Sequence, residues 1–300
     1  MNKQKLLSIT MTLLLGVSSI FAQKQPVDYV NPLMGTDSKI SLSNGNTYPA
    51  IALPWGMNFW MPQTGKMGDG WAYTYASDKI RGFKQTHQPS PWINDYGQFS
   101  IMPMTKQLKI DQDSRASWFS HKAEKATPYY YSVYLSEYNM TTEIAPTERC
   151  AYFRFTFPEA SDAYVVVDAF DRGSYVKVIT TRNSGGVPQN FRNYFVIEFD
   201  KPFTFNKVWA DYHLVETHLE LQSNHVGAAI GFSTKKGEQV HAKVASSFIS
   251  PEQAEPRKPD VKLGMTYWDV SKSKTMMRTG CVPSILVCIV RYYSPVCSTK

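Results

Sequence analysis

The sequence predicts an all-β protein built as a large antiparallel β-sandwich. Short runs rich in β-branched and aromatic residues recur between Val27 and about Ser250. Turn-forming residues separate these runs, and no long stretch with helical periodicity lies between them, which favours a sandwich over a parallel α/β sheet. The clearest runs are Tyr129–Leu135, Ala151–Phe157, Ala163–Asp168, Tyr194–Phe199 and Val226–Phe232.

The first residues have the pattern of an export signal. Lys3 and Lys5 precede an almost wholly apolar stretch, and a small residue stands at the expected cleavage point. We therefore expect residues 1–22 to be a signal peptide and residues 23–255 to form one β-sandwich domain. The mature protein would be periplasmic or secreted, with no membrane segment after signal removal. A signal that stays in the membrane as an anchor is the alternative.

The positive charge of the chain belongs to its ends. The formal net charge is +7, of which Lys3 and Lys5 supply +2 and residues 256–300 supply +6, leaving −1 for residues 23–255. A surface that binds nucleic acid needs basic residues clustered on the folded body. We therefore expect no nucleic-acid partner.

Cysteine and histidine spacing gives no sign of a metal site or a disulfide framework. Cys150 stands alone in the body, and the other three cysteines, at 281, 288 and 297, lie near the C-terminus. This distribution is unlike that of a small secreted domain held by disulfides. No Cys/His pattern has the spacing of a zinc site, so no metal ligands are predicted in this chain.

The segment from His87 to Gly97 carries the strongest functional signal. Its two prolines remove backbone donors and hold the chain extended, which predicts a rigid loop. A pyranose presents an apolar face and a ring of hydroxyls, so it suits an aromatic ring beside carboxylate and amide groups. A capped turn, in which Asp95 accepts from backbone N–H groups, is the alternative. The candidate substrate-binding residues are His87, Trp92, Asn94 and Asp95.

The wider region from Asp37 to Gly97 is rich in glycine and proline and holds several tryptophans. Long loops of this composition often carry binding residues, although packing in the core is the alternative for each tryptophan. The tryptophans in and just after this region are Trp55, Trp60, Trp71, Trp92 and Trp118.

A catalytic pair is not evident among the acidic residues. Glycoside hydrolysis needs two carboxyl groups on either side of the scissile bond, one protonated and one ionised. No candidate stands in a motif that assigns it either role, so no catalytic residue is predicted. The candidates are Asp69, Asp78, Asp95, Glu143, Glu148, Asp168, Asp171 and Asp211.

A series of motifs runs through the body in a fixed order. The first part holds Val30–Thr36, Gly45–Pro49, Ala52–Met57, Ile80–Phe83, Thr86–His87 and Asp95–Gly97, the last running on to Met102 and Pro103. The last part holds Tyr194–Phe199 and Ser246–Ala254. Together they resemble the opening domain of glycoside hydrolase family 92, over roughly Val27 to Ala254.

This resemblance implies an exo-acting α-mannosidase that inverts configuration, depends on calcium and joins an N-terminal β-sandwich to a C-terminal (α/α)6 barrel. In that family the acid, the base and the calcium ligands come chiefly from the barrel, while the sandwich closes over the terminal mannose. His87, Trp92 and Asp95 match the loop that the sandwich contributes. The sequence of residues 88–92 resembles that of family members that cleave α-1,2 linkages. The implied partners are a mannose-containing glycan and the barrel.

The sequence after Glu255 does not continue as a barrel. With the reading frame shifted, Leu263–Ser271 can encode WNDVLGRI, and Val282–Lys300 can encode TFYSCLYRSLLFPRMFYE. Both strings resemble the linker and first barrel helix of the family. We therefore expect residues 256–300 to be an out-of-frame tail, through a true frameshift or a sequencing error. Such a tail would be unstructured except for a helix or strand formed by chance.

Without the barrel, half of the expected catalytic site is missing. Catalysis needs groups placed within hydrogen-bond reach of the glycosidic oxygen, and calcium needs several converging oxygen ligands. We therefore expect this chain to bind no calcium and to be inactive alone. A carbohydrate-binding module without catalysis, or an inactive fragment, is the alternative function.

Overall fold

The computed structural model describes most of the β-rich body. The described residues are 26–37, 47–53, 56, 58–66, 72–86, 99–147, 149–169, 174–179, 192–249, 254 and 284–291. The chain divides into two units, residues 1–31 and 32–300, and the described part of the first contains a short 3-10 helix, η1 (Pro26–Tyr29). No helix within the described ranges is long and apolar enough to cross a membrane.

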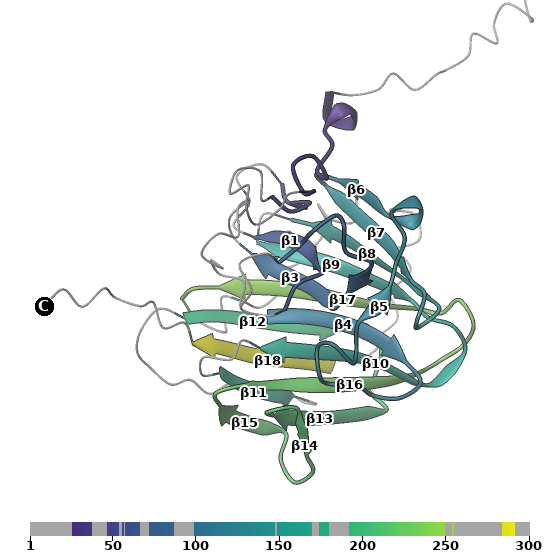
Figure 1. The fold of residues 1–300 in the computed structure, drawn as a ribbon. Helices are drawn as coiled ribbons and strands as arrows, with labels where there is room; N and C mark the ends of the chain where they lie inside the picture. Colours follow the sequence, from purple (N-terminus) through teal and green to yellow (C-terminus); the bar gives the residue numbers. More distant parts are fainter. Residues whose placement is uncertain are drawn as a thin grey trace, which may run out of the picture. The chain divides into compact units, whose positions relative to one another are not determined.

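The second unit is built from two large antiparallel sheets (Figure 1). The seven-stranded sheet has the order β1 (Phe59–Gln63), β3 (Gly82–Thr86), β4 (Phe99–Thr105), β10 (Ala160–Ala169), β16 (Val226–Thr234), β13 (Phe205–Ala210) and β14 (His213–Val215). The nine-stranded sheet has the order β15 (Glu220–Ser223), β11 (Ser174–Ile179), β18 (Ser284–Arg291), β12 (Arg192–Phe199), β17 (Gln239–Ser247), β9 (Cys150–Thr156), β8 (Met140–Pro146), β7 (Tyr130–Leu135) and β6 (Lys125–Thr127). The remaining elements are β2 (Lys79–Ile80), which pairs with β5 (Ser117–Trp118), and a 3-10 turn, η2 (His121–Ala123).

The inward faces of the two sheets share one apolar core. Phe99 of the seven-stranded sheet stacks on Phe195 of the nine-stranded sheet, with ring centroids 3.7 Å apart. Trp60 is fully buried and meets Phe99 and Phe153 edge to face, at 5.7 and 5.1 Å. Such aromatic pairs add to the burial of apolar area that drives sheets to pack face to face. The predicted all-β sandwich is confirmed.

The predicted strands agree closely with the observed ones. Each of the five apolar runs coincides with β7, β9, β10, β12 or β16, with ends that differ by a few residues at most. The region expected to consist of long loops also contains β1 and β3, and Trp60 lies in the core. β1 escaped the sequence pattern because it contains Pro62, which an edge strand tolerates since its outer side needs no N–H.

One part of the C-terminal tail is described, and it forms a strand. Ser284–Arg291 pairs with β11 on one side and β12 on the other. These eight residues are the kind of chance strand that we allowed for in an otherwise unstructured tail. The physical reason is their uninterrupted apolar sequence, Ile285–Val290, which is rich in β-branched residues.

Candidate functional site

The segment predicted to bind sugar joins β3 to β4. The predicted contacts His87, Trp92, Asn94 and Asp95 all lie outside the residues that the structure describes, so their roles stay predictions. Both anchors of the segment are described, because β3 ends at Thr86 and the adjacent β4 begins at Phe99. We call the end of the sandwich where Thr86 and Phe99 lie the loop end.

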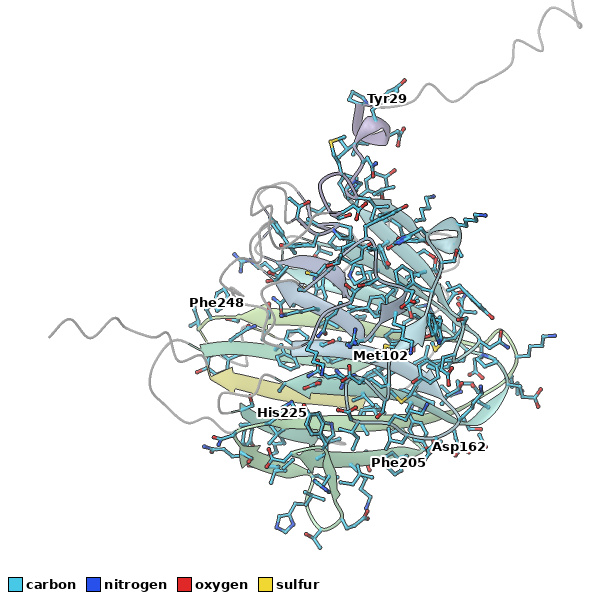
Figure 2. The ribbon with its side chains drawn as sticks, viewed as in Figure 1. Tyr29, Met102, Asp162, Phe205, His225 and Phe248 are labelled. Carbon is cyan, nitrogen blue, oxygen red and sulfur yellow. The ribbon has the colours of Figure 1, made fainter. Side chains whose placement is uncertain are left out.

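Strands of both sheets begin or end at the loop end. In the seven-stranded sheet, β1 begins opposite Thr86 and β10 ends opposite Phe99. In the nine-stranded sheet, β17 ends at Ser247, opposite Tyr194 of β12. Figure 2 shows His225, just before β16, and Phe248, just after β17, on this same side of the fold. The segment 87–98 therefore leaves from and returns to a rim to which both sheets contribute.

A buried polar cluster closes the core at the loop end. The Asn58 amide nitrogen donates to Ser246 Oγ at 2.8 Å, and the Gln85 amide nitrogen donates to Asn58 Oδ1 at 2.6 Å and to Ser246 Oγ at 2.8 Å. Asn58 also donates to the carbonyl of Arg149 at 2.5 Å. Gln85 and Ser246 come from different sheets, and Gln85 directly precedes the last residue of β3. The cluster therefore fixes the base of the segment relative to both sheets.

Some buried polar atoms near this cluster lack a hydrogen-bond partner among the described residues. They are Gln85 Oε1 and both amide atoms of Asn193, a fully buried residue at the start of β12. Buried polar groups are normally satisfied, so unpartnered ones mark a place where further polar contacts are favourable. At the loop end, these atoms of Gln85 and Asn193 are therefore available for further hydrogen bonds.

A second row of residues crosses the outer face of the seven-stranded sheet near the loop end. The strand register aligns Lys84, Ser100, Asp168, Gly227 and Trp209 across β3, β4, β10, β16 and β13. Their neighbours along each strand face the core, so alternation places this row on the outside. Lys84 and Asp168 are nevertheless at most 1% exposed, so charged side chains are buried here.

Asp168 is the centre of this buried charged cluster. Its Oδ2 accepts from the Arg115 guanidinium at 2.6 Å, and its Oδ1 lies 2.7 Å from His225 Nε2. Arg115 is fully buried and also donates to the carbonyls of Arg81 and Ile110. Each of the three guanidinium nitrogens of Arg115 thus has an acceptor, which offsets part of the cost of burying the ion pair. Both carboxylate oxygens are thus engaged, which leaves Asp168 unsuited to act as a catalytic acid.

Aromatic rings enclose the histidine of this cluster. Trp209 and Tyr212 meet the His225 ring edge to face, with centroids 5.0 and 4.9 Å away. A Cβ on Gly227 would lie 2.2 Å from the Trp209 ring, so only glycine lets Trp209 pack against the strand. Burial, and then the nearby charge of Asp168, raise the pKa of Tyr212. The cluster is therefore packed around His225, with Tyr212, which is 41% exposed, on its solvent side.

Glu143 forms a comparable pair on the other sheet. It accepts from the Arg154 guanidinium through both oxygens, and the Tyr130 hydroxyl donates to it at 2.6 Å. Its neighbours Thr142 and Ile144 are fully buried on the core side, so Glu143 lies on the outer face of the nine-stranded sheet. Asp168 and Glu143 therefore lie on opposite sides of the sandwich and cannot flank one glycosidic bond.

From the sequence, Asp168 is only one of several candidate acidic residues. Its partners Arg115 and His225 lie 53 and 57 residues away along the chain, so no local sequence pattern predicts the cluster. Four other candidate carboxylates lie outside the described residues: Asp69, Asp95, Glu148 and Asp171.

The described ranges contain no group of three or more His, Cys, Asp or Glu side chains that could hold a metal ion.

The model of the glycosyl hydrolase family 92 N-terminal domain matches residues 29–247. The chain belongs to this family. The matched region ends with β17, so family 92 accounts for the sandwich up to its last strand before the tail. The comparison with curated protein sequences found no match.

Solved structures of family 92 enzymes share the fold. The inverting mannosidase BT2199 from Bacteroides thetaiotaomicron VPI-5482 is 45% identical, with a TM-score of 0.72, over 84% of this chain and 36% of that one. The α-mannosidase BT3965 from Bacteroides thetaiotaomicron is 26% identical, with a TM-score of 0.68, over 83% of this chain and 37% of that one. BT3965 has also been solved in complex with mannoimidazole. The chain thus spans little more than a third of the length of the enzymes it matches.

Proposed function

We propose that this chain is the substrate-contacting domain of an exo-α-mannosidase that removes terminal α-1,2-linked mannose. The observation that carries the proposal is the match of residues 29–247 to the family 92 N-terminal domain, together with 45% identity to an inverting mannosidase. The preference for α-1,2 linkages is supported only by the sequence of residues 88–92, Gln-Pro-Ser-Pro-Trp.

The sugar would bind at the loop end. Trp92 would cover the apolar face of the mannose ring, while Asp95 and Asn94 accept and donate hydrogen bonds at neighbouring hydroxyls, beside His87. The polar cluster of Asn58, Gln85 and Ser246 supports this placement, because it fixes the base from which the segment departs. A segment with a fixed base loses less conformational freedom when the sugar binds.

Hydrolysis would depend on a second domain. Inversion requires one carboxylic acid to protonate the leaving oxygen and one carboxylate to activate a water on the opposite face of the ring. Asp168 and Glu143 are both engaged by arginines and lie on opposite faces. We therefore place the acid, the base and the calcium ion of the complete enzyme on a C-terminal (α/α)6 barrel, and infer that this chain alone turns over no substrate.

The remaining proposals concern the two ends. The signal-like residues 1–22 support export to the periplasm or beyond, where mannose-containing glycans would be met. The shifted-frame strings support an out-of-frame origin for residues 256–300, which sequencing of the encoding DNA would test. Codons incompatible with WNDVLGRI between Leu263 and Ser271 would exclude it.

Mannose release from α-1,2-mannobiose, measured with and without calcium, tests the proposal for activity. We expect no release by this chain and release when the coding sequence is restored to the barrel frame. Release of mannose by the chain alone would show that the catalytic groups lie within its 300 residues.

Binding without turnover is the second candidate function, and the engagement of Asp168 and Glu143 favours it. Calorimetric titration with mannose or mannobiose would detect such binding. Trp92→Ala should abolish the binding, whereas Trp118→Ala is the matched control, since Trp118 is a half-exposed tryptophan in the separate β2–β5 ribbon. Equal affinities for the two variants would contradict a role for Trp92.

A further inference from the structure

The nine-stranded sheet contains a gap that its neighbouring strands cannot close. β11 and β12 are both antiparallel to β18, so they run parallel to each other with one strand between them. Adjacent strands lie about 4.8 Å apart, so β11 and β12 are separated by about twice that distance. Without β18, two facing rows of backbone N–H and C=O groups would be left unpaired in the middle of a sheet.

The strand that fills this gap comes from outside the family domain. The family match ends at residue 247, and β18 begins at Ser284. Its register extends over Ser174–Ile179 on one side and over Arg192–Phe199 on the other, so both neighbours pair with it along their length. The sandwich therefore presents an acceptor for one strand that the described residues between 29 and 247 do not supply.

The side chains of β11 and β12 beside the gap determine which kind of strand can bind there. On the core side lie Val176, Phe195 and Ile197, all fully buried. On the outer side lie Tyr194 and Val196, which form a second apolar cluster with Ala254 and the partly buried Tyr175. Because both faces are apolar, the acceptor favours a continuous apolar run over a strand with alternating polar residues. The run Ile285–Val290 has this character.

We propose that the gap between β11 and β12 is a strand-acceptor site, which binds an extended apolar segment antiparallel to both neighbours. Its occupant in this chain is Ser284–Arg291, acting as a donor strand that a separate peptide of the same sequence can replace. Recognition rests on backbone pairing and on apolar side chains at successive positions, as in other complexes in which a strand is added to a sheet. It does not depend on the sugar-binding role proposed above.

Hydrogen exchange in the full chain tests the acceptor. The double variant Val287→Pro and Ile289→Pro removes two backbone donors from β18 and should make amides of β11 and β12 exchange about tenfold faster or more, through local opening. A synthetic peptide of residues 284–291, added in excess, should restore the protection. Ser273→Pro, outside the strand, is the matched control and should leave exchange unchanged. Wild-type exchange in the double variant, or no rescue by the peptide, would overturn the proposal.

A disulfide test remains decisive if the proline variant does not fold. Val176 and Cys288 are register partners, and Cα atoms of such partners lie about 4.5–5.5 Å apart, within reach of a disulfide. With Cys281 and Cys297 replaced by serine, Val176→Cys should form a disulfide with Cys288 under mild oxidation. Val133→Cys, on β7, is the control that should not. Mass spectrometry that finds no 176–288 link would place β18 elsewhere and sink the proposal.

Discussion

Asp168 and Glu143 are both carboxylates paired with an arginine on the outer face of a sheet, yet their surroundings differ. Both members of the Asp168–Arg115 pair have fully buried side chains, whereas in the Glu143–Arg154 pair the side chains are 10% and 24% exposed. Water can take over part of the solvation of Arg154 if its partner is lost, but not that of Arg115. The same chemical pair should therefore contribute very differently to stability.

Removal of the buried carboxylate should have the largest effect. Asp168→Ala leaves Arg115 as an uncompensated buried charge and takes the partner from His225, so we expect a loss of about 3–5 kcal/mol in the free energy of unfolding. Urea denaturation measures it. A loss below about 1 kcal/mol, the level of an exposed pair, would mean that water reaches Arg115.

Removal of Glu143 should cost less. Glu143→Ala deletes charged hydrogen bonds to Arg154 and Tyr130, so we expect a loss of about 1.5–3 kcal/mol, reduced because the Arg154 side chain can turn into solvent. A double-mutant cycle with Arg154→Ala separates the pair from its surroundings. Equal losses for Glu143→Ala and Asp168→Ala would contradict the role assigned to burial.

The tyrosine beside Glu143 makes the comparison dependent on pH. Burial, and then its hydrogen bond to Glu143, raise the pKa of Tyr130 to about 12. Because the pKa is higher in the folded state than the usual value near 10, this contribution is complete below about pH 10 and is lost as pH rises towards 12. Tyr130→Phe should cost about 1 kcal/mol at neutral pH. It should also make the decline in stability between pH 10 and 12 shallower, which denaturation at several pH values would measure.

Tyr134→Phe is the matched control for that measurement, because its ring is exposed and its hydroxyl bonds Asn139 within a surface turn. An identical alkaline profile for wild type and Tyr130→Phe would contradict the role given to Tyr130.

The smallest effect is expected at the surface carboxylate Asp113. Hydrogen bonds from Lys66 and then Arg81 lower its pKa, but half of the Asp113 side chain is exposed. A carboxyl group whose pKa is lowered in the folded state stabilises the protein at pH values above its usual pKa. This stabilisation is lost as the pH falls through the lowered pKa. Because water and salt screen this contribution, Asp113→Asn should cost about 0–1 kcal/mol, and less in high salt. Thermal denaturation at low and high salt would check both points.

Strands could be predicted from the sequence where the strand itself has a recognisable apolar, β-branched pattern. Ala163–Asp168 and Tyr194–Phe199 are apolar and β-branched over their whole length, so their identity as strands needed no tertiary information. β1 was missed because Pro62 and its aromatic neighbours gave a loop-like composition, and only its position at a sheet edge makes that composition compatible with a strand.

The candidate site was predictable only in part. The prolines around Trp92 marked a loop, and the described strand ends at Thr86 and Phe99 agree with its position between strands. The buried polar cluster at the loop end could not be predicted from the sequence, because Asn58, Gln85 and Ser246 become neighbours only when the two sheets pack. Long-range pairing of polar residues has no local pattern.

The position of β18 also has a consequence for how the chain folds as it is made. Strands β6 to β9 pair in sequence order through short hairpins, so that half of the nine-stranded sheet can form early. By contrast, Ser174 of β11 can pair only after its partner Val290, 116 residues later in the chain, has been synthesised. Contacts between such distant residues are slow to form. The growing polypeptide would therefore carry two open strand edges until Ser284–Arg291 emerges, and during that interval it would be prone to aggregation.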